Sequence, residues 1–383
     1  DNPEQAAVEA YGGHLRFSSG EVVFSSLDLL RGEFSREGSL ASREATQYLE
    51  RHGHRGNDLR AVLERFRDLR VLVVGDLIVD EYVSCEALGM SQEDPTIVVT
   101  PVLNERFVGG AGIVAGHASG LGATTRLVTV MGDDDIAAFT LERLASYGIE
   151  THCVTDESRP TTLKQRYRSG GNTLLRVSHL KQHEIEQDLQ QRFFEIVVDH
   201  LEDTDLLIFS DFNYGCLPPA LVEMIVTEGR RRGISMVADS QSSSQVGDIA
   251  RFRGMRLLTP TEREARLALR DFNSGLVVIA DMLCEKADAE NVILTMGPEG
   301  LLVYSRRRDA QGLATDQLPA LNSRPKDTAG AGDSLLIVAS MALAAGADIW
   351  QSSYLGSLAS ACQVGRTGNI PLTVSDLLRE IGD

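Results

Sequence analysis

The chain has 383 residues, of which 43% are hydrophobic and 24% are charged, and its formal net charge is −18. This composition is that of an ordinary globular protein that can bury a large core, and its length favours two or three domains. Because so acidic a chain repels phosphodiester backbones and anionic lipid, we expect neither nucleic acid nor a membrane to be its main partner.

The first 58 residues have a different pattern from the rest of the chain. Residues 12–17 and 21–25 predict two short strands, and the polar, glycine-containing stretch 51–58 predicts a linker. A helix with apolar side chains at helical spacing follows the linker. We therefore predict an N-terminal extension and linker over residues 1–58 and a separate domain over residues 59–383.

Short apolar runs alternate with helical stretches through this second domain. The runs are typical of buried parallel strands and cover residues 71–75, 125–130, 206–210, 235–238, 257–259, 292–295 and 301–304. The helical stretches cover residues 113–121, 135–147, 187–201, 218–232 and 262–269. Alternation of this kind predicts a doubly wound α/β sheet, in which ligands bind at the carboxyl ends of the strands.

Two segments depart from this alternation. Residues 82–107 and 161–179 have the pattern of antiparallel strands, with a hairpin turn at residues 170–172. Strands outside the main sheet are suited to form a lid over an active site.

The sequence Asp-Thr-Ala-Gly-Ala-Gly-Asp at residues 327–333 is followed by an apolar helical run. A glycine-rich turn that enters a helix directs unpaired N–H groups at one point, where an anion binds. Gly330, Ala331 and Gly332 would let the backbone approach a phosphate, and Asp333 would accept the proton of an attacking hydroxyl. Such turns and capping aspartates also occur for structural reasons alone, and no G-K-[ST] follows that would make a Walker A loop.

Four segments together resemble the PfkB (ribokinase-like) family of carbohydrate kinases, over roughly residues 69–383. The Asp-Thr-Ala-Gly-Ala-Gly-Asp segment resembles the C-terminal signature of the family. Residues 108–115 resemble its N-terminal glycine pair, residues 259–264 its T-P-N-x-x-E segment, and residues 295–300 its T-x-G-x-x-G turn.

The resemblance implies a mostly parallel sheet flanked by helices, a small β-strand lid, and a kinase that uses ATP and Mg²⁺. It implies that Glu264 holds the magnesium ion and its waters, for which a single carboxylate is sufficient. It places the nucleotide beside Thr295, Gly297, Gly300, Thr328 and Ser357.

Within the family, the sequence is similar to the D-glycero-D-manno-heptose 7-phosphate kinases of ADP-heptose synthesis. The residues that carry this similarity include Asp76, Glu105 and Arg106. It implies a substrate site made of Asp80, Gly109, Gly110, Lys164, Arg166, Arg176 and Asp211. The basic side chains would supply the local positive charge that an acidic protein needs to bind a sugar phosphate, although each is also consistent with a solvated strand face.

The departures from the heptose kinases are concentrated on the substrate side. Ile113 stands where the family usually has an asparagine, and Tyr214 and Gln241 replace two lysines. Because a lost hydrogen-bonding side chain usually means a lost hydroxyl partner, we predict an acceptor other than the usual heptose phosphate.

Other functions remain open at this stage. A binding module that senses a sugar phosphate or nucleotide and a kinase for a nucleoside or vitamin precursor are the alternatives.

Residues 12–30 resemble the tail of a nucleotidyltransferase-like domain of the kind fused to some relatives, but without an H-x-G-H motif we predict no nucleotidyl transfer. The resemblance also suggests a homodimer formed through the lid.

The five cysteines form no C-x-x-C pair and predict neither a zinc site nor disulfides. No signal or membrane-spanning pattern is present, so we expect a cytoplasmic protein.

Overall fold

The computed structural model describes residues 43–170, 172–241, 247–307, 312, 314–322 and 324–381. They belong to one compact unit that runs from Leu40 to Asp383. The two strands predicted between residues 12 and 25 lie outside the described residues. Among the described helices, none has the length and hydrophobicity needed to cross a membrane.

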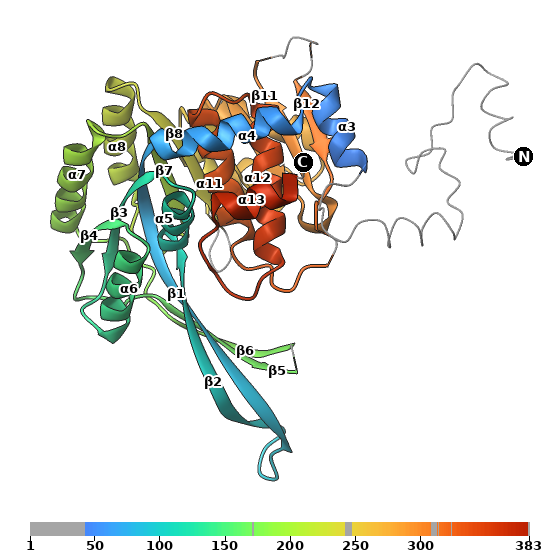
Figure 1. Ribbon diagram of the computed structural model, residues 1–383. Helices are drawn as coiled ribbons and strands as arrows, with labels where there is room; N and C mark the ends of the chain where they lie inside the picture. The colour runs from blue at the N-terminus through green and yellow to red at the C-terminus, as the bar shows by residue number, and fades with distance from the viewer. Residues whose placement is uncertain are drawn as a thin grey trace, which may run out of the picture. The chain divides into compact units, whose positions relative to one another are not determined.

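The unit is organised around a central sheet whose strand order is β12-β11-β10-β9-β8-β7-β1-β3-β4 (Figure 1). Neighbouring strands from β4 to β10 are parallel, whereas β11 and β12 add an antiparallel edge. The strands are β1 (Arg70–Met90), β3 (Thr124–Met131), β4 (Glu150–Thr155), β7 (Leu206–Asp211), β8 (Ser235–Ser240), β9 (Leu257–Leu258), β10 (Asn291–Thr295), β11 (Leu301–Ser305) and β12 (Thr315–Leu318).

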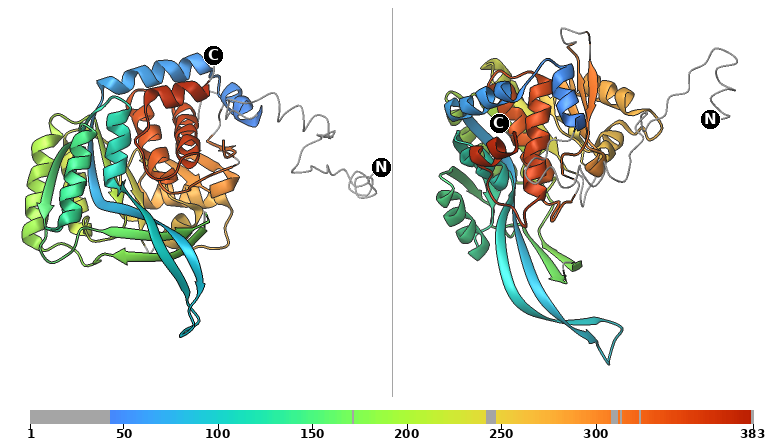
Figure 2. Two further views of the ribbon diagram at one scale, coloured as in Figure 1. Left: turned by 60° about the horizontal axis from the view of Figure 1, so that its bottom comes forward. Right: turned by 45° about the vertical axis from the view of Figure 1, so that its right-hand side comes forward.

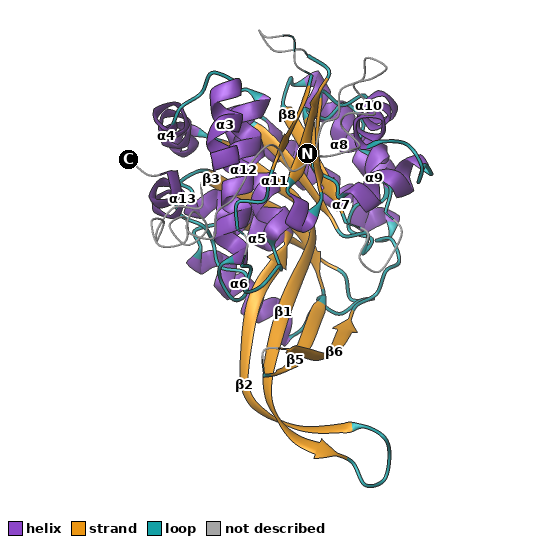
Figure 3. Cartoon of the chain, turned by 90° about the vertical axis from the view of Figure 1, so that its right-hand side faces the viewer, coloured by secondary structure: helices purple, strands orange, loops and turns teal. Residues whose placement is uncertain are grey.

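Helices cover both faces of the sheet, as Figure 3 shows. Val71 and Val73 of β1 belong to one hydrophobic core and Leu72 and Val74 to the other, because alternate side chains of a strand point to opposite faces. The first core contains side chains from α3 (Arg43–Arg51), α4 (Gly56–Glu64), α5 (Ala111–Gly120), α6 (Asp135–Ser146), α11 (Ala331–Ala344), α12 (Ile349–Val364) and α13 (Val374–Ile381). The second contains side chains from α7 (Gln187–Leu201), α8 (Pro219–Arg231), α9 (Glu262–Leu269) and α10 (Leu276–Ala287).

The lid grows out of the central sheet through β1, which continues past the sheet and pairs there with new strands (Figure 2). From Leu77 it pairs antiparallel with β2 (Ile97–Gly110) and from Val79 parallel with β5 (Leu163–Ser169). Strand β5 pairs in turn with β6 (Asn172–His179). The predicted lid is therefore confirmed, but its first strand begins at Arg70 inside the core.

The polar stretch predicted as a linker lies between α3 and α4 within the compact unit. His52 stacks on Trp350 of α12, with ring centroids 4.0 Å apart, and its Nε2 lies 2.9 Å from a carboxylate oxygen of Asp316. Tyr48 of α3 is fully buried beside it. The compact unit thus includes α3, which precedes the predicted linker, because Ala45, Tyr48 and Leu49 bury an apolar face of this helix.

Candidate active site

A cavity of about 1000 Å³ lies at the carboxyl ends of the parallel strands, between the lid and the start of α11. Most of the predicted site residues line it. On the lid side these are Asp80, Gly110, Lys164, Arg166 and Arg176, and on the opposite side Glu264, Thr295, Gly297, Gly300, Thr328, Gly330, Ala331, Gly332, Asp333 and Ser357. The sequence motifs, which are far apart in the chain, therefore meet in one place.

The turn that enters α11 requires glycine at residue 330, the N-cap of the helix. Gly330 has φ +75°, in the left-handed region that favours glycine. A Cβ on Gly330 would lie 2.4 Å from the side-chain oxygen of Asn369. The next residues, Ala331 and Gly332, are the first two of the helix, where N–H groups lack intrahelical partners and the helix dipole favours an anion.

Asp327, the first residue of this motif, connects the turn to the lid. Its carboxylate accepts hydrogen bonds from the Tyr82 hydroxyl at 2.6 Å and from the backbone N–H groups of Ala329 and Gly368 at 3.1 and 3.2 Å. Tyr82 belongs to the lid part of β1. The sequence motif contained Asp327, but nothing in its pattern assigned this connecting role.

Asp333 is the third residue of α11 and is only 5% exposed. Its Oδ1 atom is buried and has no hydrogen-bond partner among the described residues. Burial, and to a lesser extent the charge of Asp80, raises the pKa of Asp333 to about 7, while Lys164 acts in the opposite direction. A carboxylate with a pKa near neutrality is well suited to accept a proton at physiological pH.

Two further carboxylates are available for a metal ion. Glu264 closes the capping box of α9, in which the N–H and hydroxyl of Thr261 both donate to its Oε2 at 2.8 Å. Asp239, near the end of β8, is buried in the cavity wall. Its pKa is raised well above the usual range by burial and by the charges of Glu264 and Asp333. An all-oxygen, acidic donor set of this kind fits Mg²⁺.

Asp239 was missed as a site residue in the sequence analysis. The available signal was its position directly after the apolar run of residues 235–238, at the edge of the sheet where ligands bind. Asn369, in the loop between α12 and α13, also lines the cavity and was missed. No local pattern marks it, because the tertiary fold alone brings this loop to Gly330.

The lid side of the cavity carries paired charges. Asp80 forms an ion pair with Arg166, and its other oxygen accepts a hydrogen bond from the Asn369 amide at 3.2 Å. The Lys164 ammonium lies over the rings of Phe212 and Tyr214, 5.2 and 5.0 Å from their centroids. Arg166 and Asn369 therefore hold the Asp80 carboxylate at the cavity wall, and its role as a substrate residue stays a prediction.

The loop that presents these two rings is fixed by Asp76. The Asp76 carboxylate accepts hydrogen bonds from the backbone N–H groups of Phe212, Tyr214 and Cys216 at 2.7, 3.3 and 3.2 Å. Burial raises the pKa of Asp76 to about 6, although these hydrogen bonds act to lower it. Tyr214 and Gln241, two of the departures from the heptose kinases, both line the cavity.

Two predicted substrate residues, Asp211 and Gly109, do not line the cavity, and neither does Ile113. The Asp211 carboxylate forms an ion pair with Arg251 at 2.8 Å and accepts a hydrogen bond from Ser240 at 2.6 Å, so it stabilises the β7–β8 region. A Cβ on Gly109 would lie 2.7 Å from Asp80, which places this glycine behind that carboxylate. Ile113 is fully buried in α5.

The nucleotide side was predicted as a glycine-rich turn between two strands. Gly297 and Gly300, with φ +60° and +92°, form the turn between β10 and β11. A Cβ on Gly300 would lie 2.1 Å from the Leu318 carbonyl oxygen, so only glycine allows this close approach. Thr328 and Ser357 line the same part of the molecule from the α11 turn and from α12.

Comparison with known proteins identifies the family of this chain. The chain matches the model of the pfkB family carbohydrate kinases over residues 68–375. It is 30% identical over 319 residues to the bifunctional protein HldE of Geobacter sulfurreducens, covering 82% of this chain and 63% of that protein. It is also 30% identical over 331 residues to the HldE protein of Rhodopseudomonas palustris, covering 85% and 66%. The chain thus spans about two thirds of the length of these relatives.

Solved structures resemble this chain in fold. Escherichia coli phosphofructokinase-2, in complex with substrates and products, superimposes with a TM-score of 0.66 at 16% identity, covering 82% of this chain and 98% of that one. Thermotoga maritima ribokinase gives a TM-score of 0.63 at 20% identity, covering 82% and 100%. The predicted ribokinase-like α/β fold is confirmed.

Proposed function

Because this chain belongs to the pfkB family of carbohydrate kinases, we propose that it transfers the γ-phosphoryl group of ATP to a hydroxyl of a sugar or sugar phosphate. The family and the enzyme class, a phosphotransferase with an alcohol acceptor, are those predicted from the sequence. The observation that carries the proposal for this site is the buried Asp333 carboxylate, with its pKa near 7, beside the N-terminus of α11.

Each part of the cavity has a role in this reaction. Asp333 accepts the proton of the acceptor hydroxyl as that oxygen attacks phosphorus. The N–H groups of Ala331 and Gly332, at the positive end of the helix dipole, stabilise negative charge on the transferred phosphoryl group. Glu264 and Asp239 are the residues that would hold Mg²⁺, which would neutralise phosphate charge.

We propose an anionic acceptor, that is, a sugar that already carries a phosphate. Lys164 and Arg176 line the lid side of the cavity of a protein whose net charge is −18. Tyr214 and Gln241 stand in the cavity wall where heptose kinases have lysines, so the phosphate or its hydroxyls would be bound differently. This supports a sugar phosphate other than heptose 7-phosphate.

The acceptor is tested by measuring ADP release from Mg·ATP against matched pairs of sugars and their phosphates. Turnover with one phosphorylated sugar, and much weaker turnover with its neutral counterpart, is the expected result. Preference for a neutral sugar or a nucleoside would overturn the choice of acceptor but leave the kinase in place. ATP binding without turnover on any acceptor would instead favour the sensing module.

We also propose that two copies pair through the lid. Its strands expose large apolar side chains, among them Val102 at 70%, Leu88 at 63% and Met90 at 62%. Exposed apolar surface of this extent usually marks an interaction site. Sedimentation should show a dimer that Val102→Glu and Leu88→Glu dissociate, whereas Met224→Glu on α8 should not. A monomeric wild-type chain at micromolar concentration would contradict this.

The relation to longer proteins is a proposal of the same kind. The relatives named above are bifunctional, and this chain spans about two thirds of their length. A nucleotidyltransferase-like domain fused to this kinase in the full-length protein, with residues 12–30 as its tail, is consistent with both facts, and we place this protein in the cytoplasm. The segment that motivated this idea, residues 12–30, lies outside the described residues.

A further inference from the structure

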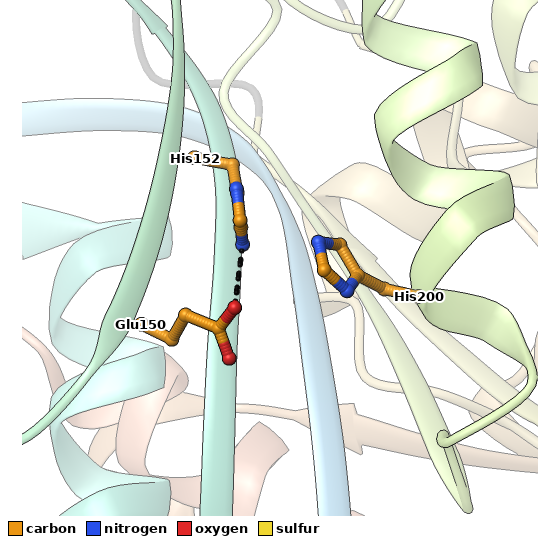
Figure 4. A group of neighbouring side chains, drawn as sticks. All are labelled: Glu150, His152 and His200. Carbon is orange, nitrogen blue, oxygen red and sulfur yellow. Dashed lines mark hydrogen bonds and ion pairs between the residues drawn. The ribbon is translucent and has the colours of Figure 1, made fainter.

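Three potential metal ligands meet at the end of the sheet opposite the active-site cavity (Figure 4). Glu150 and His152 lie on the edge strand β4, and His200 lies in the last turn of α7, which packs against this strand. Because side chains two residues apart in a strand share a face, Glu150 and His152 point the same way, toward His200. Glu150 is the first residue of β4, whereas the active site lies at the carboxyl ends of the parallel strands.

The ligand atoms are already close to the geometry that a metal ion requires. One ligand atom from each of the three residues lies within 4.8 Å of the other two. His152 Nε2 and Glu150 Oε1 are 3.1 Å apart, and the two imidazole rings have centroids 4.3 Å apart with their planes tilted by 39°. Ligands of a tetrahedral zinc ion lie roughly 3.3 Å apart, given Zn–N and Zn–O distances near 2 Å. Small side-chain rotations would complete such a site.

The charges around the cluster are compatible with a cation. Arg126 of β3 binds Glu150 through Oε2 at 2.8 Å, so Oε1 is the oxygen directed at His152. The carboxyl end of α7 favours positive charge at His200.

We propose that Glu150, His152 and His200 bind one divalent transition-metal ion of the zinc type, with a water at the fourth position, and so join the edge strand β4 to α7. Two imidazoles and one carboxylate are a donor set that zinc uses in proteins. The site contains no cysteine, which is why the search for cysteine pairs could not find it. It is separate from the magnesium site proposed in the cavity, whose donors are all oxygen atoms.

The proposal is tested by titrating the tag-free 383-residue chain, treated with a chelator, with Zn²⁺ in the presence of millimolar Mg²⁺ to occupy the carboxylates of the cavity. The wild type should bind one Zn²⁺ per chain, and His152→Gln and His200→Gln should each weaken this binding more than about tenfold, since even outer-shell changes at zinc sites cost 10–100-fold. His54→Gln is the matched control, because His54 also pairs with a carboxylate but belongs to no group of three potential ligands among the described residues. It should bind Zn²⁺ like the wild type.

Two further measurements separate a built site from weak surface binding. Zn²⁺ should raise the melting temperature of the wild type and of His54→Gln but not of the two ligand variants, whose melting temperatures without metal should match the wild type. The proposal is overturned if the wild type binds no stoichiometric Zn²⁺, or if His152→Gln and His200→Gln bind it with unchanged affinity.

Discussion

The two walls of the active-site cavity differ in how their charged groups are partnered. On the α11 wall, Asp333 and Asp239 are buried among other carboxylates, and their pKa values are raised. On the lid wall, Asp80 is bound by Arg166, and Lys164 lies over two aromatic rings. The carboxylates of the α11 wall thus favour binding of a proton and of a cation. On the lid wall, the Lys164 ammonium contacts only aromatic rings in these interactions, and we propose that it binds an anionic acceptor instead.

Removal of the proposed metal ligand Glu264 should have a large effect on catalysis. Glu264→Gln should lower kcat by about 10²-fold and raise the Mg²⁺ concentration needed for half-maximal rate, because a charged ligand is lost at the site of charge stabilisation. Glutamine can still fill the capping box, so the fold should persist. ADP release measured across a Mg²⁺ series tests this.

Glu262→Gln is the matched control for this variant. Glu262 lies in the same first turn of α9 but forms an ion pair with Arg266 at the surface. Its substitution should leave the Mg²⁺ dependence unchanged. An equal shift in both variants would mean that the helix, not the carboxylate at Glu264, is responsible.

Substitution of the lid lysine should affect binding of the acceptor more than the rate of chemistry. Lys164→Ala should raise KM for a phosphorylated sugar by about tenfold or more, since a charge-assisted hydrogen bond contributes about 1.5–3 kcal/mol, and change kcat less. Lys181→Ala, which removes a lysine outside the cavity, is the control. Steady-state kinetics with the phosphorylated and neutral sugars would separate the two, and an unchanged KM would remove Lys164 from the acceptor site.

The turn before α11 should be sensitive to a single methyl group. Gly330→Ala places a Cβ 2.4 Å from Asn369 at φ +75° and should lower the free energy of unfolding by about 1–3 kcal/mol. Gly332→Ala is the control, because its Cβ would meet nothing within 4 Å. Urea unfolding of both variants tests the difference, and equal stabilities would contradict the assigned geometry of the turn.

Neutralising Asp333, the proposed general base, should stabilise the protein in a pH-dependent way. The pKa of Asp333 is about 7 in the folded chain and near 3.9 when unfolded. Its ionisation therefore lowers the free energy of unfolding progressively as the pH rises from about 4 to about 7, and fully above pH 7. Above pH 7, the free energy of unfolding of Asp333→Asn should therefore exceed that of the wild type by about 1–3 kcal/mol. The difference should shrink toward zero as the pH falls to about 4. A difference that does not depend on pH would argue against a raised pKa.

The sequence predicted the core strands and the α11 wall well because both have strong local signals. Buried parallel strands are continuous apolar runs, and in the motif at residues 327–333 Gly330 marks a turn whose positive φ favours glycine. The polar edge strand β4 (Glu150–Thr155) was not predicted, because Thr, His and Cys alternate there without a long apolar run. The helix α10 (Leu276–Ala287) was also not predicted, because it begins with a β-branched apolar run that resembles a strand.

The lid wall was predicted only in part, for a different reason. The basic residues of β5 were visible in the sequence, but their partners come from distant segments. Asn369 donates a hydrogen bond to Asp80 from a loop that follows α12. Asp211 forms an ion pair with Arg251 and does not line the cavity. Such pairings depend on tertiary structure, so a sequence motif can place a charged residue near a site without saying what it binds.

The most direct test of the central claim is to measure ATP affinity and single-turnover phosphoryl transfer in the wild type and in Asp333→Asn with the best acceptor. The account predicts that the variant binds Mg·ATP with nearly unchanged affinity and transfers the phosphoryl group about 10²–10⁴-fold more slowly, as expected for loss of a general base. Asp188→Asn, which changes an exposed carboxylate in the first turn of α7, should behave like the wild type. Transfer by Asp333→Asn at the wild-type rate would contradict the account.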